Sequence, residues 1–307
     1  MKIIGDVPVN GLGFEVARGL KGTLMKLPAN MDKISLFRGK SLEQIIKLEP
    51  KPMATATINK ALHRFSALVE WAVRHGYCQQ NCFKGLAIKK RQRAHEERAI
   101  FSADDLSKLF TGDIFRGGKI LHPHYYWLPL LGLYSGARLE EICQLHLADI
   151  REIDGLWCLD IKGGEGKQIK TASSERCIPI HSELVRLGLV RYVEHLKTKN
   201  ETMLFPELKR IRGKLGHDVS KWFIRYRRSR KVGMMNDGKK CFHSFRHGVS
   251  DCLKQKGVAE EKVTGLLGHV EGSTTFGRYG KAYQPEPLKD VVEMLQFEGL
   301  PEVEPYC

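Results

Sequence analysis

GLYSGARLEEICQL, at residues 132–145, is the most informative stretch of this sequence. An apolar segment ends there in a Ser-Gly-Ala turn, and the pattern after the turn predicts a helix from Arg138 to Leu147. Residues three apart in a helix share a face, so Arg138 and Glu141 are expected side by side. Taken alone, this spacing fits a local ion pair as well as it fits an anion-binding arginine.

Three stretches downstream carry side chains that suit phosphate chemistry. IKTASSERCIPI holds Lys170 in a predicted β-hairpin, and FHSFRHG places His243 and Arg246 on one face of a helix. LLGHVEGSTTFGRYG places Tyr279 ten residues after His269. Each feature also has an ordinary explanation, because hairpin lysines are usually solvated, His–Arg pairs are common on surfaces, and most tyrosines lie in a core or at its rim.

In this order, the four stretches closely resemble the tyrosine recombinases, also called the phage integrase family. The resemblance spans about residues 100–283 and includes the PLLGLYSGAR lead-in, IPIH after the hairpin, and LFPE further along. It implies a mainly α fold with a small antiparallel β-sheet, divided into a helical core-binding domain and an α+β catalytic domain. The catalytic residues that it implies are Arg138, Lys170, His243, Arg246, His269 and Tyr279.

The resemblance also implies a role for each of these side chains. The two arginines would bind the non-bridging oxygens of the scissile phosphate, because a guanidinium stays charged and binds phosphate through two hydrogen bonds. Tyr279 would attack the phosphorus, His243 would take its proton, and His269 would hydrogen-bond the phosphate. Lys170 would protonate the departing 5′ oxygen. One ester replaces another through a 3′-phosphotyrosyl intermediate, so neither a cofactor nor a metal is expected.

The predicted hairpin holds three lysines, and the family's lysine is not fixed in sequence position. Lys162, Lys167 and Lys170 are therefore all candidates. Lys170 is preferred because its Lys-Thr setting before SSER most resembles the family's hairpin. The GGEGK segment that ends at Lys167 does not make a P-loop, since Gln168 follows it and the leading glycine is misplaced.

Composition and charge favour a nucleic-acid partner. The 307 residues include 50 Lys and Arg against 35 Asp and Glu, a net charge of +15. Between residues 209 and 231, ten basic residues and one acid alternate with aromatic side chains, which predicts a helix with a basic side and an apolar side. No bilayer-spanning run or signal peptide is evident, and the scattered cysteines are expected as free thiols in a reducing cytoplasm. The expected partner is double-stranded DNA, in the nucleoid of a bacterial or phage system, with no membrane association.

Three segments are predicted along the chain. A stripe of apolar residues from Ile58 to Ala72 predicts a long helix, and the polar, basic segment from Lys89 to Arg98 indicates a linker. Ser102 and Asp105 form a capping box that begins the next helix. The predicted segments are 1–97, the core-binding domain with its first ~40 residues unassigned; 98–283, the catalytic domain; and 284–307, an acidic tail helix.

The remaining elements of the second domain follow from apolar periodicity. Two strands are expected, Leu156–Ile161 and Arg176–Ile180, with room for a third. The expected helices are 127–134, 183–197, 219–230, 244–256, 259–267 and 287–297.

The acidic tail carries an apolar stripe that needs a surface to cover. Its members are Leu288, Val291, Val292 and Leu295. The family resemblance favours docking on a neighbouring subunit, and the alternative is a helix folded back on its own subunit. A homo-oligomer is expected, a tetramer on synapsed DNA, with accessory DNA-bending proteins as further candidate partners.

Two other functions fit part of the pattern. A type IB topoisomerase-like enzyme shares nearly the same phosphate-binding residues and tyrosine, but a monomeric enzyme needs no tail for docking. A DNA-binding protein with a relic active site would not need the complete residue set. The expected activity is therefore that of a site-specific recombinase or integrase, which cleaves and rejoins DNA.

Overall fold

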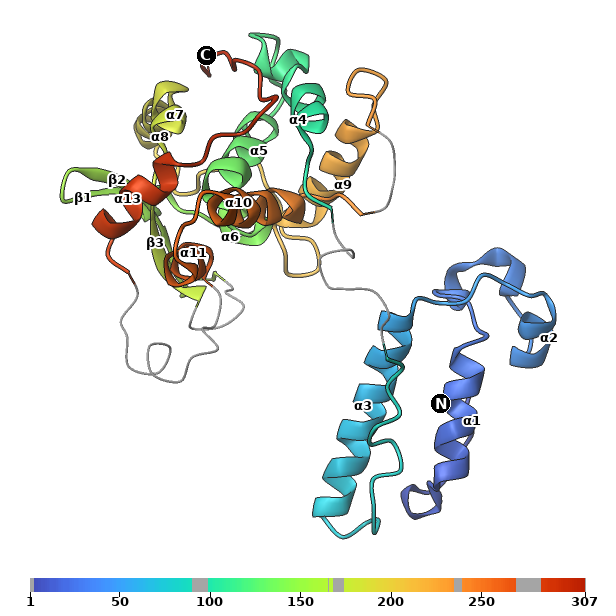
Figure 1. Ribbon diagram of the computed structural model, residues 1–307. Coiled ribbons are helices and arrows are strands. Elements are labelled where there is room, and N and C mark those ends of the chain that lie inside the picture. The colour runs from blue at the N-terminus through green and yellow to red at the C-terminus, as the bar shows by residue number, and fades with distance from the viewer. Residues whose placement is uncertain are drawn as a thin grey trace. The chain divides into compact units, whose positions relative to one another are not determined.

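The chain folds as two compact units. The computed structural model describes residues 3–89, 99–164, 166–167, 174–234, 239–268 and 283–306. The first unit is Met1–Arg93 and the second is Ala94–Cys307 (Figure 1). The division lies a few residues before the predicted boundary at 98, within the basic segment expected to be a linker.

The first unit is helical. It contains α1 (Phe14–Leu24), α2 (Leu42–Lys47) and α3 (Thr55–Arg74), with short 3-10 turns at Val9–Gly11, Met31–Lys33 and Ser35–Phe37. The predicted stripe of α3 is buried against α1 in a shared core. Helix α1 was not predicted, although its buried residues Ala17, Leu20 and Leu24 recur at helical spacing. Gly19 and Gly22 lower the helix propensity of that segment and weaken its pattern.

The second unit is built around one buried helix, α5 (Pro123–Ser135). Trp127, Leu128, Leu130 and Leu131 on this helix are fully buried. The surrounding helices are α4 (Ala103–Phe110), α6 (Leu139–Cys143), α7 (Ser182–Arg186), α8 (Leu189–Thr198), α9 (Gly216–Arg227), α10 (His243–Gln255), α11 (Glu260–Leu267) and α13 (Glu286–Glu293), with 3-10 turns at Asp113–Phe115 and Leu147–Asp149. None of the described helices is long and apolar enough to cross a membrane.

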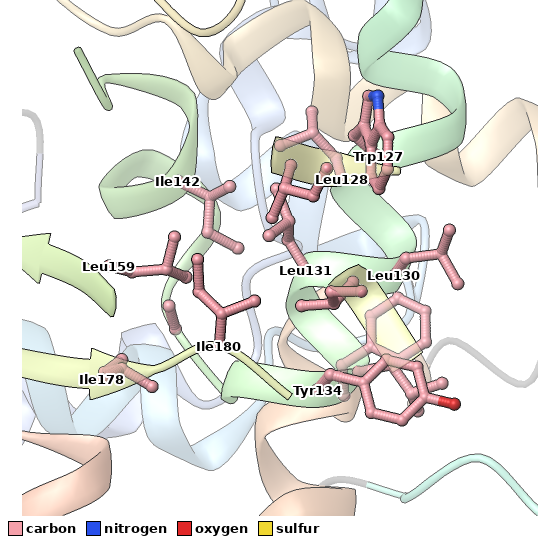
Figure 2. Packing of buried hydrophobic residues seen from close by; sticks show 14 of the residues in the cluster. Trp127, Leu128, Leu130, Leu131, Tyr134, Ile142, Leu159, Ile178 and Ile180 are labelled. Atoms are coloured by element: carbon pink, nitrogen blue, oxygen red, sulfur yellow. The ribbon is translucent and has the colours of Figure 1, made fainter. Parts of the chain in front are cut away.

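A small antiparallel sheet packs on this helical core. Its strands are β1 (Ile150–Ile153), β2 (Leu156–Ile161) and β3 (Arg176–Pro179), in the order β1-β2-β3. Figure 2 shows Leu159, Ile178 and Ile180 beside Ile142, on the side of the sheet that faces α5. The third strand, β1, joins β2 through Asp154 and Gly155, both with positive φ, in a two-residue turn typical of hairpins. The fold is mainly α with a small antiparallel sheet, as the sequence predicted.

Several predicted helices differ from those observed. The single helix expected at 183–197 is two helices, α7 and α8, because Gly188 adopts a left-handed conformation between them (φ 96°). The helix expected from Arg138 to Leu147 ends at Cys143. The basic helix α9 begins and ends three residues earlier than expected. The capping box of Ser102 and Asp105 is present at the start of α4, as predicted.

The apolar stripe of the tail is covered by its own chain, and docking of the tail on a neighbouring subunit stays a prediction. The four stripe residues are 0–3% exposed within their own chain and belong to the core of the second unit. Glu293 accepts hydrogen bonds from the main-chain N and the Oγ of Ser182, at 2.8 and 2.6 Å. Further along, Tyr306 donates its main-chain N–H to Leu187 O at 2.9 Å. The tail therefore covers its own subunit, which was the alternative left open.

Candidate active site

The structure describes three of the six predicted catalytic residues: Arg138, His243 and Arg246. Lys170, His269 and Tyr279 lie outside the described residues. Arg138 and Arg246 come from different helices, yet both guanidinium groups reach the C-terminal end of α11. The described part of the site is therefore built around that helix end.

Arg138 stands at the N-terminus of α6 and makes the predicted pair with Glu141. Its main-chain N–H donates to Glu141 Oε2 at 2.8 Å and its Nη1 donates to Oε1 at 2.5 Å. Its Nη2 extends further and donates to Gly268 O at 3.3 Å. The side chain keeps 21% of its surface exposed. The local ion pair therefore holds an arginine that also reaches α11 and solvent.

Arg246 is buried on α10, with only 3% of its surface exposed. Its Nη1 donates to Gly136 O at 3.0 Å, and its Nη2 donates to Leu267 O. Burial lowers the pKa of this guanidinium, and the nearby charges of Arg138 and Arg176 lower it further, to about 9. Among the described residues, its hydrogen-bond acceptors are these two main-chain carbonyls, so a full positive charge lies here without a carboxylate bonded to it.

A third arginine, Arg176, completes the cluster and was not predicted. It is the first residue of β3, opposite Ile161 of β2, and its side chain is 3% exposed. Its Nη2 donates to Glu141 Oε2 at 2.9 Å and its Nε donates to Leu266 O at 2.7 Å. The sequence did contain a signal: Arg176 shares a strand face with two buried isoleucines, and an arginine on such a face is rare unless it is paired.

The cluster carries more positive than negative charge. Two of its three guanidinium groups, those of Arg138 and Arg176, pair with one buried carboxylate, that of Glu141, and Arg246 binds main-chain carbonyls. Burial alone would raise the pKa of Glu141, but Arg176 and then Arg138 lower it below its usual value, so the carboxylate is ionised. Three successive main-chain carbonyls at the end of α11 each accept a hydrogen bond from one of these arginines, and the helix dipole places partial negative charge there. The excess charge makes this a place where an anion is stabilised.

His243 is the first residue of α10, three positions before Arg246. Its ring lies 4.8 Å, centroid to centroid, from that of His247, with the two rings nearly perpendicular. His243 is half-buried, so it retains access to solvent.

Two of the three candidate hairpin lysines are described, and they differ in environment. Lys167 Nζ lies 2.7 and 2.8 Å from the carboxylate oxygens of Asp149, and its side chain is 5% exposed. Lys162 is 45% exposed and lies 3.2 Å from Asp160. Lys167 is thus held in a buried ion pair, whereas Lys162 makes a surface pair.

The basic helix α9 has two sides, as predicted. Val219 and Phe223 are buried, while Lys221, Arg225 and Arg228 are exposed. Arg227, although basic, belongs to the buried side. It is 3% exposed and its guanidinium carbon lies 5.8 Å from the centre of the Phe223 ring. Its position in the helix turns it inward, where an aromatic face stabilises its charge.

The sequence His122-Pro123-His124 lies at the start of α5. Pro123 is the first residue of the helix, a position that proline favours, and His124 Nδ1 lies 2.7 Å from Glu207 Oε1. Within the described ranges, no group of three or more His, Cys, Asp or Glu side chains could hold a metal ion.

Curated relatives of this chain are recombinases. It is 30% identical over 149 residues to the tyrosine recombinase XerA of Pyrococcus horikoshii, a match that covers 48% of this chain and 47% of that protein. The match therefore spans about half the length of this relative. It is also 25% identical over 272 residues to the tyrosine recombinase XerC of Thermodesulfovibrio yellowstonii, covering 84% of this chain and 79% of the relative.

Solved structures of integrases share the fold. A λ integrase dimer bound to a COC′ core site matches with a TM-score of 0.56 and 17% identity, covering 92% of this chain and 84% of that one. The Tn1549 transposon integrase in complex with circular intermediate DNA matches with a TM-score of 0.57 and 17% identity, covering 91% and 84%. The sequence model described as the phage integrase family matches residues 119–285, more than half of the 307 residues. The chain belongs to the phage integrase family.

Proposed function

We propose that this protein is a site-specific tyrosine recombinase, which cleaves and rejoins double-stranded DNA through a covalent bond to Tyr279. The observation that carries the proposal is the cluster of three arginines, two of them buried, with a single carboxylate among them. Such a cluster is costly to bury unless an anion compensates it. A phosphodiester has two non-bridging oxygens, which match the geometry of two neighbouring guanidinium groups.

Arg138 and Arg246 are the arginines proposed to bind the scissile phosphate. Arg138 is partly exposed and Arg246 has no carboxylate among its described hydrogen-bond partners, so both have capacity for an anion. Negative charge that builds on the phosphate during attack would then be stabilised in a site with little water. His243, on the same helix as Arg246, is proposed to take the proton of the attacking phenol.

Three proposed roles belong to residues outside the described ranges. Tyr279 is the nucleophile and His269 a hydrogen-bond donor to the phosphate. His269 directly follows Gly268, whose carbonyl accepts a hydrogen bond from Arg138, and this adjacency in the chain supports its role. Lys170 is proposed to protonate the 5′ oxygen. The buried ion pair of Lys167 with Asp149 supports this choice, because the ammonium group of Lys167 is held by a carboxylate and does not serve as the proton donor.

The DNA duplex is proposed to lie against both units. The net charge of +15 and the exposed face of α9, with Lys221, Arg225 and Arg228, favour contact with the phosphate backbone. The first unit is proposed as the core-binding domain, and residues 98–283 together with the tail as the catalytic domain. A structural neighbour, with a TM-score of 0.57, is a λ integrase tetramer bound to a Holliday junction. This supports a tetramer on synapsed DNA as the working assembly, with accessory DNA-bending proteins and a location in the nucleoid as further proposals.

The tail does not distinguish a recombinase from a type IB topoisomerase, because its apolar stripe is buried in its own chain and needs no neighbouring subunit to cover it. The named relatives favour recombination, since XerA and XerC are recombinases. A plasmid with two target sites distinguishes the alternatives. A recombinase yields recombined product, a topoisomerase yields relaxation alone, and a DNA-binding protein with a relic site only retards the plasmid.

Tyr279→Phe tests the nucleophile. On a nicked suicide substrate, the wild-type protein should form a denaturation-resistant adduct and Tyr279→Phe should form none while still binding DNA. Tyr283→Phe is the matched control: Tyr283 packs over Gly265 of α11, where an added β-carbon would lie 2.5 Å from its ring. This control should keep the adduct. If Tyr279→Phe still forms the adduct, the assignment of the nucleophile is wrong.

A further inference from the structure

We infer that Arg176 is a positioning residue, which holds the guanidinium of Arg138 in place through their shared carboxylate, Glu141. The inference deepens the proposed function and rests on it. Arg176 itself is not proposed to touch DNA. It is buried, and its hydrogen bonds go to three different parts of the second unit.

The contacts of Arg176 join the root of the hairpin, α6 and α11. Its Nη1 donates to Ser174 O at 2.7 Å within its own hairpin, its Nη2 to Glu141 Oε2 on α6, and its Nε to Leu266 O on α11. Gly268 packs directly on this guanidinium, since an added β-carbon there would lie 2.8 Å from Arg176 Nη1. One planar group therefore fixes the relative positions of the hairpin root, α6 and α11, and Arg138 stands at the start of α6.

The two carboxylate oxygens of Glu141 have different hydrogen-bond partners. Oε1 accepts from Arg138 Nη1 at 2.5 Å, and Oε2 accepts from Arg176 Nη2 at 2.9 Å and from the main-chain N of Arg138 at 2.8 Å. A carboxylate held on one side by a buried arginine has little freedom to rotate. The Arg138 side chain, bonded to the other side, is oriented by the same contact.

The distribution of charge separates Arg176 from the arginines proposed to bind phosphate. Arg176 and Glu141 form a buried ion pair in which both side chains are 3% exposed. The positive charge of Arg176 is therefore already matched by a carboxylate, whereas that of Arg246 is met by main-chain carbonyls. Removing Arg176 leaves Glu141 buried with Arg138 alone, and burial then favours its neutral form. A protonated Glu141 would lose its hold on Arg138.

The first test separates cleavage from binding. We expect Arg176→Gln to lower the single-turnover rate of covalent adduct formation by roughly 10²-fold, as for a misplaced catalytic group, and to leave DNA affinity within about threefold. Arg176→Lys keeps the charge but satisfies fewer of the three acceptors, so it should be intermediate. Arg151→Gln is the matched control, because Arg151 pairs with Asp160 on the same sheet at 53% exposure. It should behave as the wild type in both assays.

The second test measures the cleavage rate as a function of pH. If Arg176 had a purely structural role, replacing it would not change this pH dependence. In Arg176→Gln the pKa of Glu141 rises, so cleavage should fall as pH is lowered through a range where the wild type, after normalisation, does not change. Adding Glu141→Gln removes the titrating group, so this acidic limb should vanish in the double variant. The double variant should also be no slower than Glu141→Gln alone, because both changes break one interaction.

The inference is overturned if binding and cleavage fall together, if the effects of Arg176→Gln and Glu141→Gln on the cleavage rate are additive, or if Arg176→Gln shows no acidic limb. A cleavage-independent measurement keeps it distinct from the proposed function. The loss of melting temperature in Arg176→Gln should be larger at pH 7 than near pH 4, where Glu141 is protonated in the unfolded chain. If the wild type forms no adduct, the proposed function fails, and this pH dependence still decides whether Arg176 controls the ionisation of Glu141.

Discussion

Replacing Leu295 by alanine tests whether the tail stabilises its own subunit. Leu295 is 0% exposed and lies in the main core of the second unit, just beyond α13. Truncating a fully buried leucine costs about 2–5 kcal/mol, part of it for the cavity that remains. Domains are stable by only about 5–15 kcal/mol, so this is a large fraction of the total. For a unit of this size, the melting temperature should fall by roughly 4–20 °C.

The assay is thermal and urea unfolding of the intact protein without DNA, at several protein concentrations. Met294→Ala is the matched control, because Met294 precedes Leu295 directly and is 40% exposed. It should change the free energy of unfolding by no more than about 0.5 kcal/mol. Because Leu295 is buried within its own chain, the loss of stability in Leu295→Ala should also not depend on protein concentration.

A different result would refute this reasoning. If Leu295→Ala melts with the wild type but fails to assemble cooperatively on paired sites, the apolar face serves a neighbouring subunit. The same reasoning predicts that a chain ending after Tyr283 does not fold, because it lacks the stripe and also Val303, which is 2% exposed. A soluble, folded truncation would contradict it equally.

Three further predictions concern charged side chains. Arg228 is exposed, so Arg228→Gln should reduce the slope of log DNA affinity against log salt concentration by about 1. Arg227 is buried, so Arg227→Gln should leave this slope unchanged and lower the melting temperature. The reverse pattern would contradict the placement of both side chains. Inorganic phosphate or vanadate should raise the melting temperature of the wild type but not of Arg246→Ala, and equal stabilisation of the two proteins would exclude Arg246 from the anion site. Lys167→Met should destabilise the protein by up to about 3–5 kcal/mol, measured by urea unfolding, because it leaves the buried Asp149 charged with Lys162, 3.7 Å away, as its remaining ion-pair partner among the described residues; a change below about 1 kcal/mol would mean that the pair with Lys167 is not retained in solution.

Local patterns in the sequence predicted local structure well. The stripe of α3 and the capping box of α4 depend on residues three or four apart, and both are present. The pair of Arg138 and Glu141 is of the same kind. Helix ends were less predictable, because a single residue such as Gly188 can divide a continuous apolar pattern by adopting a positive φ.

The partner of a surface could not be predicted from its pattern. The stripe of the tail correctly indicated an amphipathic helix, but periodicity shows only that an apolar face exists. What covers that face depends on contacts distant in sequence, such as Glu293 with Ser182, 111 residues apart. Arg176 was missed for the same reason, because its acceptors Glu141 and Leu266 lie 35 and 90 residues away.

The charge balance of the cluster links the site to its proposed substrate. The three guanidinium groups repel one another, and Glu141 compensates only part of that charge. The carbonyls at the end of α11 supply partial negative charge and keep the cluster intact without a ligand. A phosphate placed at Arg138 and Arg246 would supply the missing charge, and a phosphate gaining charge during attack would supply more. Burial, together with this repulsion, lowers the pKa of Arg246 to about 9 in the free protein, and the same two effects would favour the transition state over the ground state.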